Sequence, residues 1–148
     1  LMRSWEVAYK DIIPADFIIE KNATRQAQFK ESITIDNNDA YVIQYGEKTI
    51  GILRASLPLD DDMGDDAYEL YYIYLHPDFC KMGIGTRAME FAFDKARNMG
   101  KRIMTVWVFA ENVNSIRFYE KCGFSADGKR AVKDYGRNIE AVRMIKYL

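Results

Sequence analysis

The stretch Cys80-Lys81-Met82-Gly83-Ile84-Gly85-Thr86 decides how the rest of the chain is interpreted. It lies between an aromatic strand expected over residues 68–75 and an amphipathic helix expected over residues 83–99. The free N–H groups at a helix start point outward, and the helix dipole adds partial positive charge there. Because Gly83 and Gly85 lack a Cβ, a phosphate group can approach this backbone closely. The stretch therefore predicts a phosphate site built from backbone N–H groups.

Two other kinds of phosphate loop are excluded by the same residues. A P-loop needs a lysine after its last glycine, whereas Thr86 follows Gly85 directly. A dinucleotide-binding fold needs a third glycine and an acidic residue about 20 positions later, in the first βαβ unit. This loop has two close glycines and lies halfway along the chain.

A second motif lies downstream at residues 112–124 and has the pattern N-x-x-S-x-x-F-Y-x-x-x-G-F. Together, the loop and this motif resemble the GNAT family of N-acetyltransferases, which use acetyl-CoA. The family's phosphate loop is Q/R-x-x-G-x-G/A, and Cys80 stands where the family has Gln or Arg. The resemblance covers residues 13–148 in element order, with its specific motifs between Glu69 and Phe124.

The expected fold is one α/β (α+β) domain over residues 1–148, because this length suits a single core. The resemblance implies a mixed, largely antiparallel central sheet flanked by helices. It also implies that the strands at 68–75 and 102–109 splay apart, helped by a bulge near Tyr74. Hydrophobic periodicity and breakers predict helices at 5–13, 15–35, 83–99 and 112–121, and strands at 40–45, 48–57, 68–75, 102–109, 124–132 and 138–147.

Helix 83–99 is expected to bury one apolar stripe. Its members are Ile84, Ala88, Phe91, Ala92, Ala96 and Met99. The chain opens in helical sequence, so the family's first strand is expected to be either truncated or absent here. Without it, residues 40–45 would form an apolar sheet edge, which we expect an upstream segment or a second subunit to cover.

Composition excludes several classes of partner. A net charge of −1 gives no basic field for nucleic acid, and no apolar run approaches the roughly 20 residues of a membrane span. The two cysteines suggest no disulfide framework, which favours a cytoplasmic protein. No Cys/His grouping has metal-ligand spacing, so no metal site is predicted.

The resemblance implies two catalytic residues. Tyr119 would protonate the departing thiolate of CoA, since a phenol with a pKa of about 10 is a suitable acid. Glu69 would act as the base. Strand periodicity places Glu69 on one face with Tyr71, Ile73 and Leu75, where apolar neighbours would raise its pKa. A water relay as the base, or a Glu69 that merely pairs with a lysine, stays open.

Further residues are expected at the cofactor. They are Tyr74, Leu75, Lys81, Met82, Gly83, Ile84, Gly85, Thr86, Asn112, Ser115 and Tyr119. Asn112 would also cap the short helix that follows it. His76 is interpreted as part of the strand exit, and Cys80 as a backbone N–H donor to phosphate. The acidic loop at 60–66 is interpreted as a solvated turn, with attraction of a cationic amine as the alternative.

The sequence thus predicts an enzyme that transfers an acetyl group from acetyl-CoA to a primary amine of a small molecule or peptide. Transfer would be direct, within a ternary complex. The alternatives are a GNAT-fold module that binds acetyl-CoA without turnover, and an oligomerising scaffold. A homodimer is left open.

Overall fold

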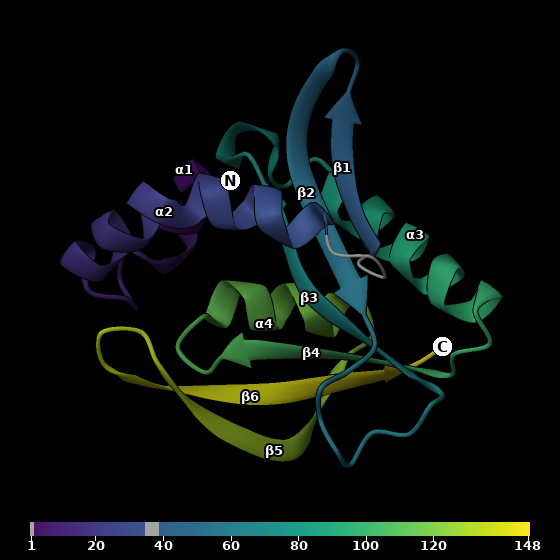
Figure 1. Ribbon diagram of the computed structural model, residues 1–148. Coiled ribbons are helices and arrows are strands. Elements are labelled where there is room, and N and C mark those ends of the chain that lie inside the picture. The colour runs from purple at the N-terminus through teal and green to yellow at the C-terminus, as the bar shows by residue number, and fades with distance from the viewer. Residues whose placement is uncertain (1, 35–38) are drawn as a thin grey trace.

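The computed structural model describes the backbone of residues 2–34 and 39–148, and the side chains of residues 3–24 and 40–148. Figure 1 shows the order of its helices and strands. They are α1 (Met2–Tyr9), α2 (Ala15–Thr34), β1 (Asp39–Tyr45), β2 (Lys48–Ser56), β3 (Ala67–Leu75), the 3-10 turn η1 (Pro77–Phe79), α3 (Ile84–Asn98), β4 (Ile103–Phe109), α4 (Val113–Lys121), β5 (Ser125–Asp134) and β6 (Asn138–Tyr147). Every predicted helix and strand is present, with ends that differ from the prediction by a few residues.

The strands form one sheet in the order β1-β2-β3-β4-β6-β5 (Figure 1). Neighbouring strands run antiparallel except β3 and β4, which are parallel. The prediction of a mixed, largely antiparallel sheet flanked by helices is therefore confirmed.

Helices cover both faces of this sheet. Met89 and Phe93 of α3 and Tyr119 of α4 pack with Val108 of β4 in the larger core cluster. The next residue, Phe109, packs in a second cluster with residues of α1 and α2. Because successive residues of a strand point to opposite faces, α3 and α4 cover one face and α1 and α2 the other.

Helix α3 begins and ends at glycines. Gly83 (φ +77°) is its N-cap, and Gly100 (φ +75°) follows its last turn, where the Lys101 N–H donates to the Ala96 oxygen at 2.9 Å. Only glycine adopts this left-handed backbone at little cost, so both ends are set by the sequence.

The buried stripe of α3 differs from the prediction. Its buried residues are Met89, Ala92, Phe93 and Ala96, whereas the predicted members Phe91 and Met99 are 47% and 45% exposed. Phe91 instead packs against the Tyr41 ring of β1 in a T-shaped arrangement, with 4.8 Å between the ring centroids.

The ladder between β3 and β4 is short. It runs from Ala67–Ile103 to Leu70–Val106 and then stops, so the two strands separate as predicted. The bulge, however, lies at Tyr71, because Leu70 pairs with Ala55 while Tyr72 pairs with Arg54. The expected bulge near Tyr74 is wrong by three residues.

This bulge also changes which side chains share a face. The extra residue reverses the alternation beyond it. Ile73 packs with Tyr68 and Leu70 on the α3 side, whereas Tyr74 packs in the cluster with α1 and α2. The prediction that Glu69 shares a face with Ile73 is therefore wrong.

The N-terminal helices meet at a corner. Helix α1 ends at Tyr9 rather than at Ile13, and Ile12 and Ile13 are buried in the turn before Pro14. Helix α2 starts immediately after Pro14, and residue 35, its predicted end, lies outside the described residues. None of the described helices combines the length and apolar composition needed to cross a bilayer.

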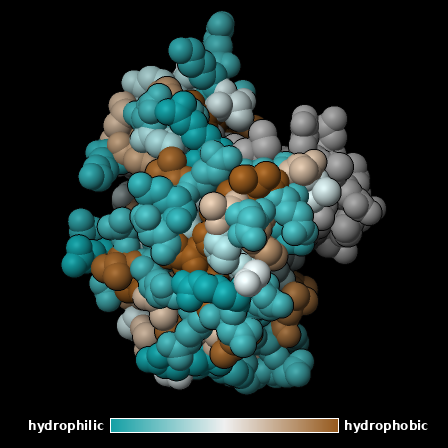
Figure 2. Space-filling view, turned by 90° about the vertical axis from the view of Figure 1, so that its left-hand side faces the viewer, coloured by the Kyte–Doolittle hydropathy of each residue, from teal (hydrophilic) through white to brown (hydrophobic). Residues whose placement is uncertain are grey.

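Figure 2 shows the side of the molecule that carries these helices as mainly hydrophilic surface with scattered hydrophobic spots. Within the described residues, β1 forms an edge of the sheet, and Val42 and Tyr45 are 63% and 54% exposed. The expectation that another segment or subunit covers this edge stays a prediction.

Candidate active site

The loop before α3 presents a row of backbone donors. In the part of the chain that the structure describes, no N–H group of residues 81–86 donates to a protein acceptor, and the helix ladder begins with Arg87 to the Gly83 oxygen. Lys81 (φ 61°) and Gly83 both have positive φ. A Cβ added to Gly83 would have no neighbour within 4 Å. The loop can therefore accept an anion at the positive end of α3.

Gly85 has a packing role. A Cβ here would lie 3.2 Å from Cε2 of Phe118 on α4 and 3.5 Å from Cδ1 of Leu75 at the end of β3. The second glycine thus lets the donor loop, the end of β3 and α4 approach one another closely.

The residues just before the loop have structural roles. The His76 ring accepts from the Asp78 N–H at 3.4 Å through Nδ1, which caps η1. The Cys80 N–H donates to the Pro77 oxygen at 3.1 Å. The interpretation of Cys80 as a donor to phosphate is therefore wrong, because its N–H is already used.

A pocket lies where β3 and β4 separate. Its volume of about 80 Å³ exceeds the roughly 10–15 Å³ that one water molecule needs, so it can hold several waters or a small acyl group. Its walls come from α1, β3, β4 and α4, and consist of Ala8, Tyr9, Tyr71, Tyr72, Ile73, Tyr74, Trp107, Val108, Ser115 and Tyr119. Three predicted site residues, Tyr74, Ser115 and Tyr119, thus meet in one pocket.

Tyr119 lies at the α4 side of this pocket. Its side chain is 7% exposed, and its ring meets the Phe124 ring edge-on at 5.7 Å between centroids. Burial, with smaller contributions from Tyr9 and Cys122, raises the pKa of the Tyr119 hydroxyl well above its usual value. The phenol therefore stays protonated at neutral pH.

The start of α4 is fixed by Asn112. This side chain is buried, and its Oδ1 accepts from the Ser115 N–H at 3.1 Å. The predicted capping role is confirmed. The cap also fixes Ser115, which lines the pocket.

Glu69 lies beside the pocket and is not part of its lining. It is 7% exposed and lies two positions before Tyr71, which does line the pocket. Burial is the main cause that raises the pKa of Glu69, and the nearby Asp60 adds to it. The Leu59 N–H donates to the Glu69 carboxylate and opposes this rise, as do the charges of Lys133 and Arg143.

The description of the family model that matches residues 5–124 is "Acetyltransferase (GNAT) family". The chain belongs to the GNAT family. It is 29% identical, over 77% of its length, to an uncharacterized N-acetyltransferase of Methanocaldococcus jannaschii. That match covers 50% of the relative. A separate match, 31% identical over 35% of this chain, covers 30% of an L-amino acid N-acyltransferase of Escherichia coli, so the chain spans half the length of these curated relatives or less.

Solved structures of GNAT proteins share the fold. The PaiA N-acetyltransferase of Thermoplasma acidophilum, in complex with coenzyme A, has a TM-score of 0.74 at 20% identity, covering 99% of this chain and 87% of that one. A GNAT acetyltransferase of Elizabethkingia anophelis with acetyl-CoA bound has a TM-score of 0.62 at 16% identity, covering 82% of each chain.

Several pocket residues of this GNAT chain were missed by sequence reasoning. Tyr9, Tyr72 and Trp107 belong to helices or strands that were predicted correctly, but no motif marks them. Tyr71 was missed as a pocket residue because the bulge, which turns it toward the pocket with Tyr72, has no signature in the sequence.

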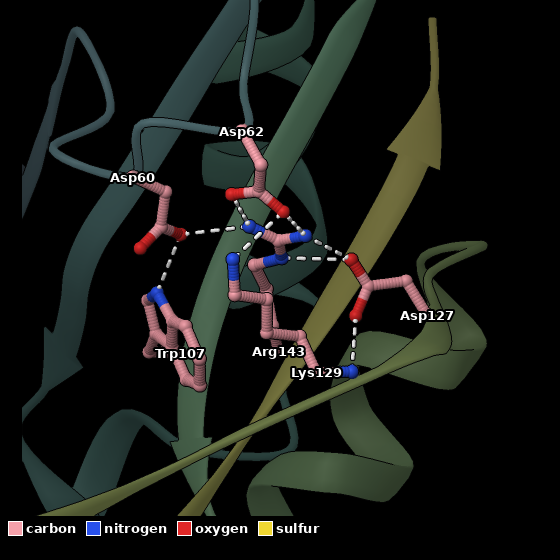
Figure 3. A network of polar contacts seen from close by, with 6 residues as sticks. All are labelled: Asp60, Asp62, Trp107, Asp127, Lys129 and Arg143. Carbon is pink, nitrogen blue, oxygen red and sulfur yellow. Dashed lines mark hydrogen bonds and ion pairs between the residues drawn. The ribbon is translucent and has the colours of Figure 1, made fainter.

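The acidic loop at residues 60–66 is a largely exposed turn, as predicted, but several of its carboxylates are paired. Asp60 and Asp62 bind the buried Arg143, and Asp66 binds Arg102 at 2.7 Å (Figure 3 shows the Arg143 contacts). These ion pairs could not be predicted from the sequence, because the cationic partners lie about 40 and 80 positions away in it.

Proposed function

We propose that this GNAT protein is an N-acetyltransferase that moves an acetyl group from acetyl-CoA to a primary amine of a small molecule or peptide. Membership of the family supports acetyl transfer as the reaction, and two solved proteins of the same fold hold CoA or acetyl-CoA. The observation that carries the proposal is the pocket in which Tyr119 of α4 faces the separated strands β3 and β4.

The donor loop fits the pyrophosphate of CoA. The N–H groups of Lys81, Met82, Gly83, Ile84, Gly85 and Thr86 lack protein acceptors among the described residues and lie at a helix start. Gly85 and Leu75 connect this loop to the pocket, so an extended arm bound at the loop can reach Ser115 and Tyr119 along the part of β3 beyond Leu70, where its ladder with β4 has ended. Buried Asn112 would border the same arm.

The pocket residues would handle the protons of direct transfer. The thioester supplies a carbonyl carbon, and the amine nitrogen bonds to it as the carbon–sulfur bond breaks. Tyr119, protonated at neutral pH, would donate its proton to the leaving sulfur. Glu69 would take the amine proton through a water molecule, because it lies beside the pocket and is not part of its lining.

A screen of primary amines tests this function. Each amine is incubated with protein and acetyl-CoA, and both free thiol and the mass of the amine product are measured. Acetylation of at least one amine class, with thiol released in equal amount, is expected. Tight acetyl-CoA binding without thiol release from any amine would favour the non-catalytic binding module instead.

A further inference from the structure

The guanidinium of Arg143 on β6 lies at the centre of a buried charge network. Its side chain is 4% exposed and contacts three carboxylates. Nη1 donates to Asp60 at 3.0 Å and to Asp62 at 2.8 Å, and Nε donates to Asp127 at 2.7 Å (Figure 3). Burying a charge is costly unless it is paired, and here each side of the guanidinium has a partner.

Two of these partners belong to the loop at residues 57–66, which Arg143 thus holds against the sheet. The same loop contacts two residues that line the pocket, Tyr71 and Trp107, and Glu69 beside it. The Tyr71 hydroxyl donates to the Leu57 oxygen at 3.2 Å, and the Trp107 Nε1 donates to Asp60 Oδ2 at 2.9 Å. The Leu59 N–H is the donor to Glu69. One loop therefore holds in place the side of the pocket that an acceptor amine would contact.

Asp60 is the residue where these contacts converge, since the same Oδ2 accepts from Trp107 and Arg143 (Figure 3). We propose that Asp60 is a positioning residue for acetyl transfer: anchored by Arg143, it fixes Trp107 in the pocket wall and holds a negative charge beside Glu69. This inference rests on the proposed function, because Asp60 would act through Glu69, the proposed base of that reaction.

The charged groups that face Glu69 come from three elements. Asp60 of the loop favours its protonated form, whereas Lys133 of β5 and Arg143 of β6 favour its ionised form. Asp60 is the carboxylate that raises the pKa of Glu69, whereas Asp62 binds Arg143 through two oxygens and Lys129 through one, all at 2.8 Å. Asp60 and Asp62 therefore share the arginine but differ in their effect on the proposed base.

This difference gives a matched pair of variants, Asp60→Asn and Asp62→Asn. Asparagine at position 60 can still accept from Trp107 and Arg143, but it removes the negative charge beside Glu69. The Glu69 carboxyl is titrated by ¹³C NMR in the whole protein, with its signal assigned from Glu69→Gln. Asp60→Asn should move the titration midpoint to lower pH, and by more than Asp62→Asn does. The acidic limb of the acetyl-transfer rate should move in the same direction.

Equal midpoints in wild type and Asp60→Asn would overturn the inference, as would equal shifts in the two variants. If Asp60→Asn does not fold, Asp60→Ser, which also removes the charge, takes its place: a midpoint at lower pH supports the inference, and an unchanged one overturns it. The titration needs no acceptor. A protein that shows the shift but acetylates no amine would contradict the proposed function while supporting the placement of Asp60.

Discussion

Tyr119 is protonated at neutral pH, as any tyrosine would be, and burial raises the pKa of its hydroxyl further. Tyr119→Phe keeps the ring contacts with Phe118 and Phe124 but removes the acid. We expect kcat to fall roughly 100-fold, with acetyl-CoA affinity little changed, as for other positioned acids. Steady-state rates and calorimetric titration measure both quantities. Tyr147→Phe, which changes a 74% exposed tyrosine, is the control. Wild-type turnover in Tyr119→Phe would refute the assignment.

Gly83 and Gly100 form a matched pair at the two ends of α3. Both have positive φ near 75°, and a Cβ at either would meet nothing within 4 Å. Alanine at each position should cost about 1 kcal/mol of stability through backbone strain. Only Gly83→Ala places its methyl group where a phosphate is expected, and it should weaken acetyl-CoA binding roughly 10-fold or more. Equal acetyl-CoA affinities of the two variants in calorimetry would show that this loop does not bind the phosphate.

Glu69 links stability to pH. Burial raises the pKa of Glu69 in the folded protein above its pKa in the unfolded chain. Its contribution to the free energy of unfolding is therefore fully present below the unfolded-state pKa and is lost as pH rises through the folded-state pKa. Glu69→Gln should therefore unfold at a higher temperature than wild type at neutral pH, with the difference vanishing in acid. Thermal unfolding across this pH range measures the effect. A wild type that is more stable than Glu69→Gln at neutral pH would mean that the carboxylate is stabilised there.

At the scale of elements, the α1–α2 corner is held by the hairpin between β5 and β6. Arg137 Nε donates to the Ile12 oxygen at 2.9 Å, and its Nη2 binds Glu111 at 2.7 Å. Arg137→Met should cost about 1–2 kcal/mol and speed amide exchange in α1, because two charge-assisted contacts are lost.

The control is Arg130→Met, which removes the exposed pair with Glu140 on the same hairpin and should cost under about 1 kcal/mol. Denaturant unfolding and hydrogen exchange compare the two variants. Similar costs and unchanged exchange in α1 would show that the corner does not depend on Arg137.

Sequence patterns predicted which elements form, but not how they face one another. Helix α3 was placed correctly, yet its stripe includes Met89 and Phe93 because packing against the sheet, rather than composition, selects the buried side. The bulge at Tyr71 could not be predicted, because no glycine or proline marks it.

At the scale of the whole molecule, the motif residues were predictable because they depend on local structure. The donor loop follows from two glycines at a helix start, and the Asn112 cap from its position. The aromatic wall and the Arg143 network join segments that are distant in the chain, such as Trp107 with the loop at 57–66. Such contacts follow from the packed fold, and no single segment encodes them.

Direct transfer from acetyl-CoA to an amine, without an acetylated enzyme, is the central claim, and intact-protein mass measurement tests it most directly. The two free cysteines, exposed Cys80 and half-buried Cys122, are the groups a covalent route would use. With acetyl-CoA alone, the protein mass should stay unchanged and no thiol should appear. After an amine found in the screen is added, thiol and acetylated amine should form in equal amounts. An acetyl adduct on the protein that the amine then removes would contradict the account.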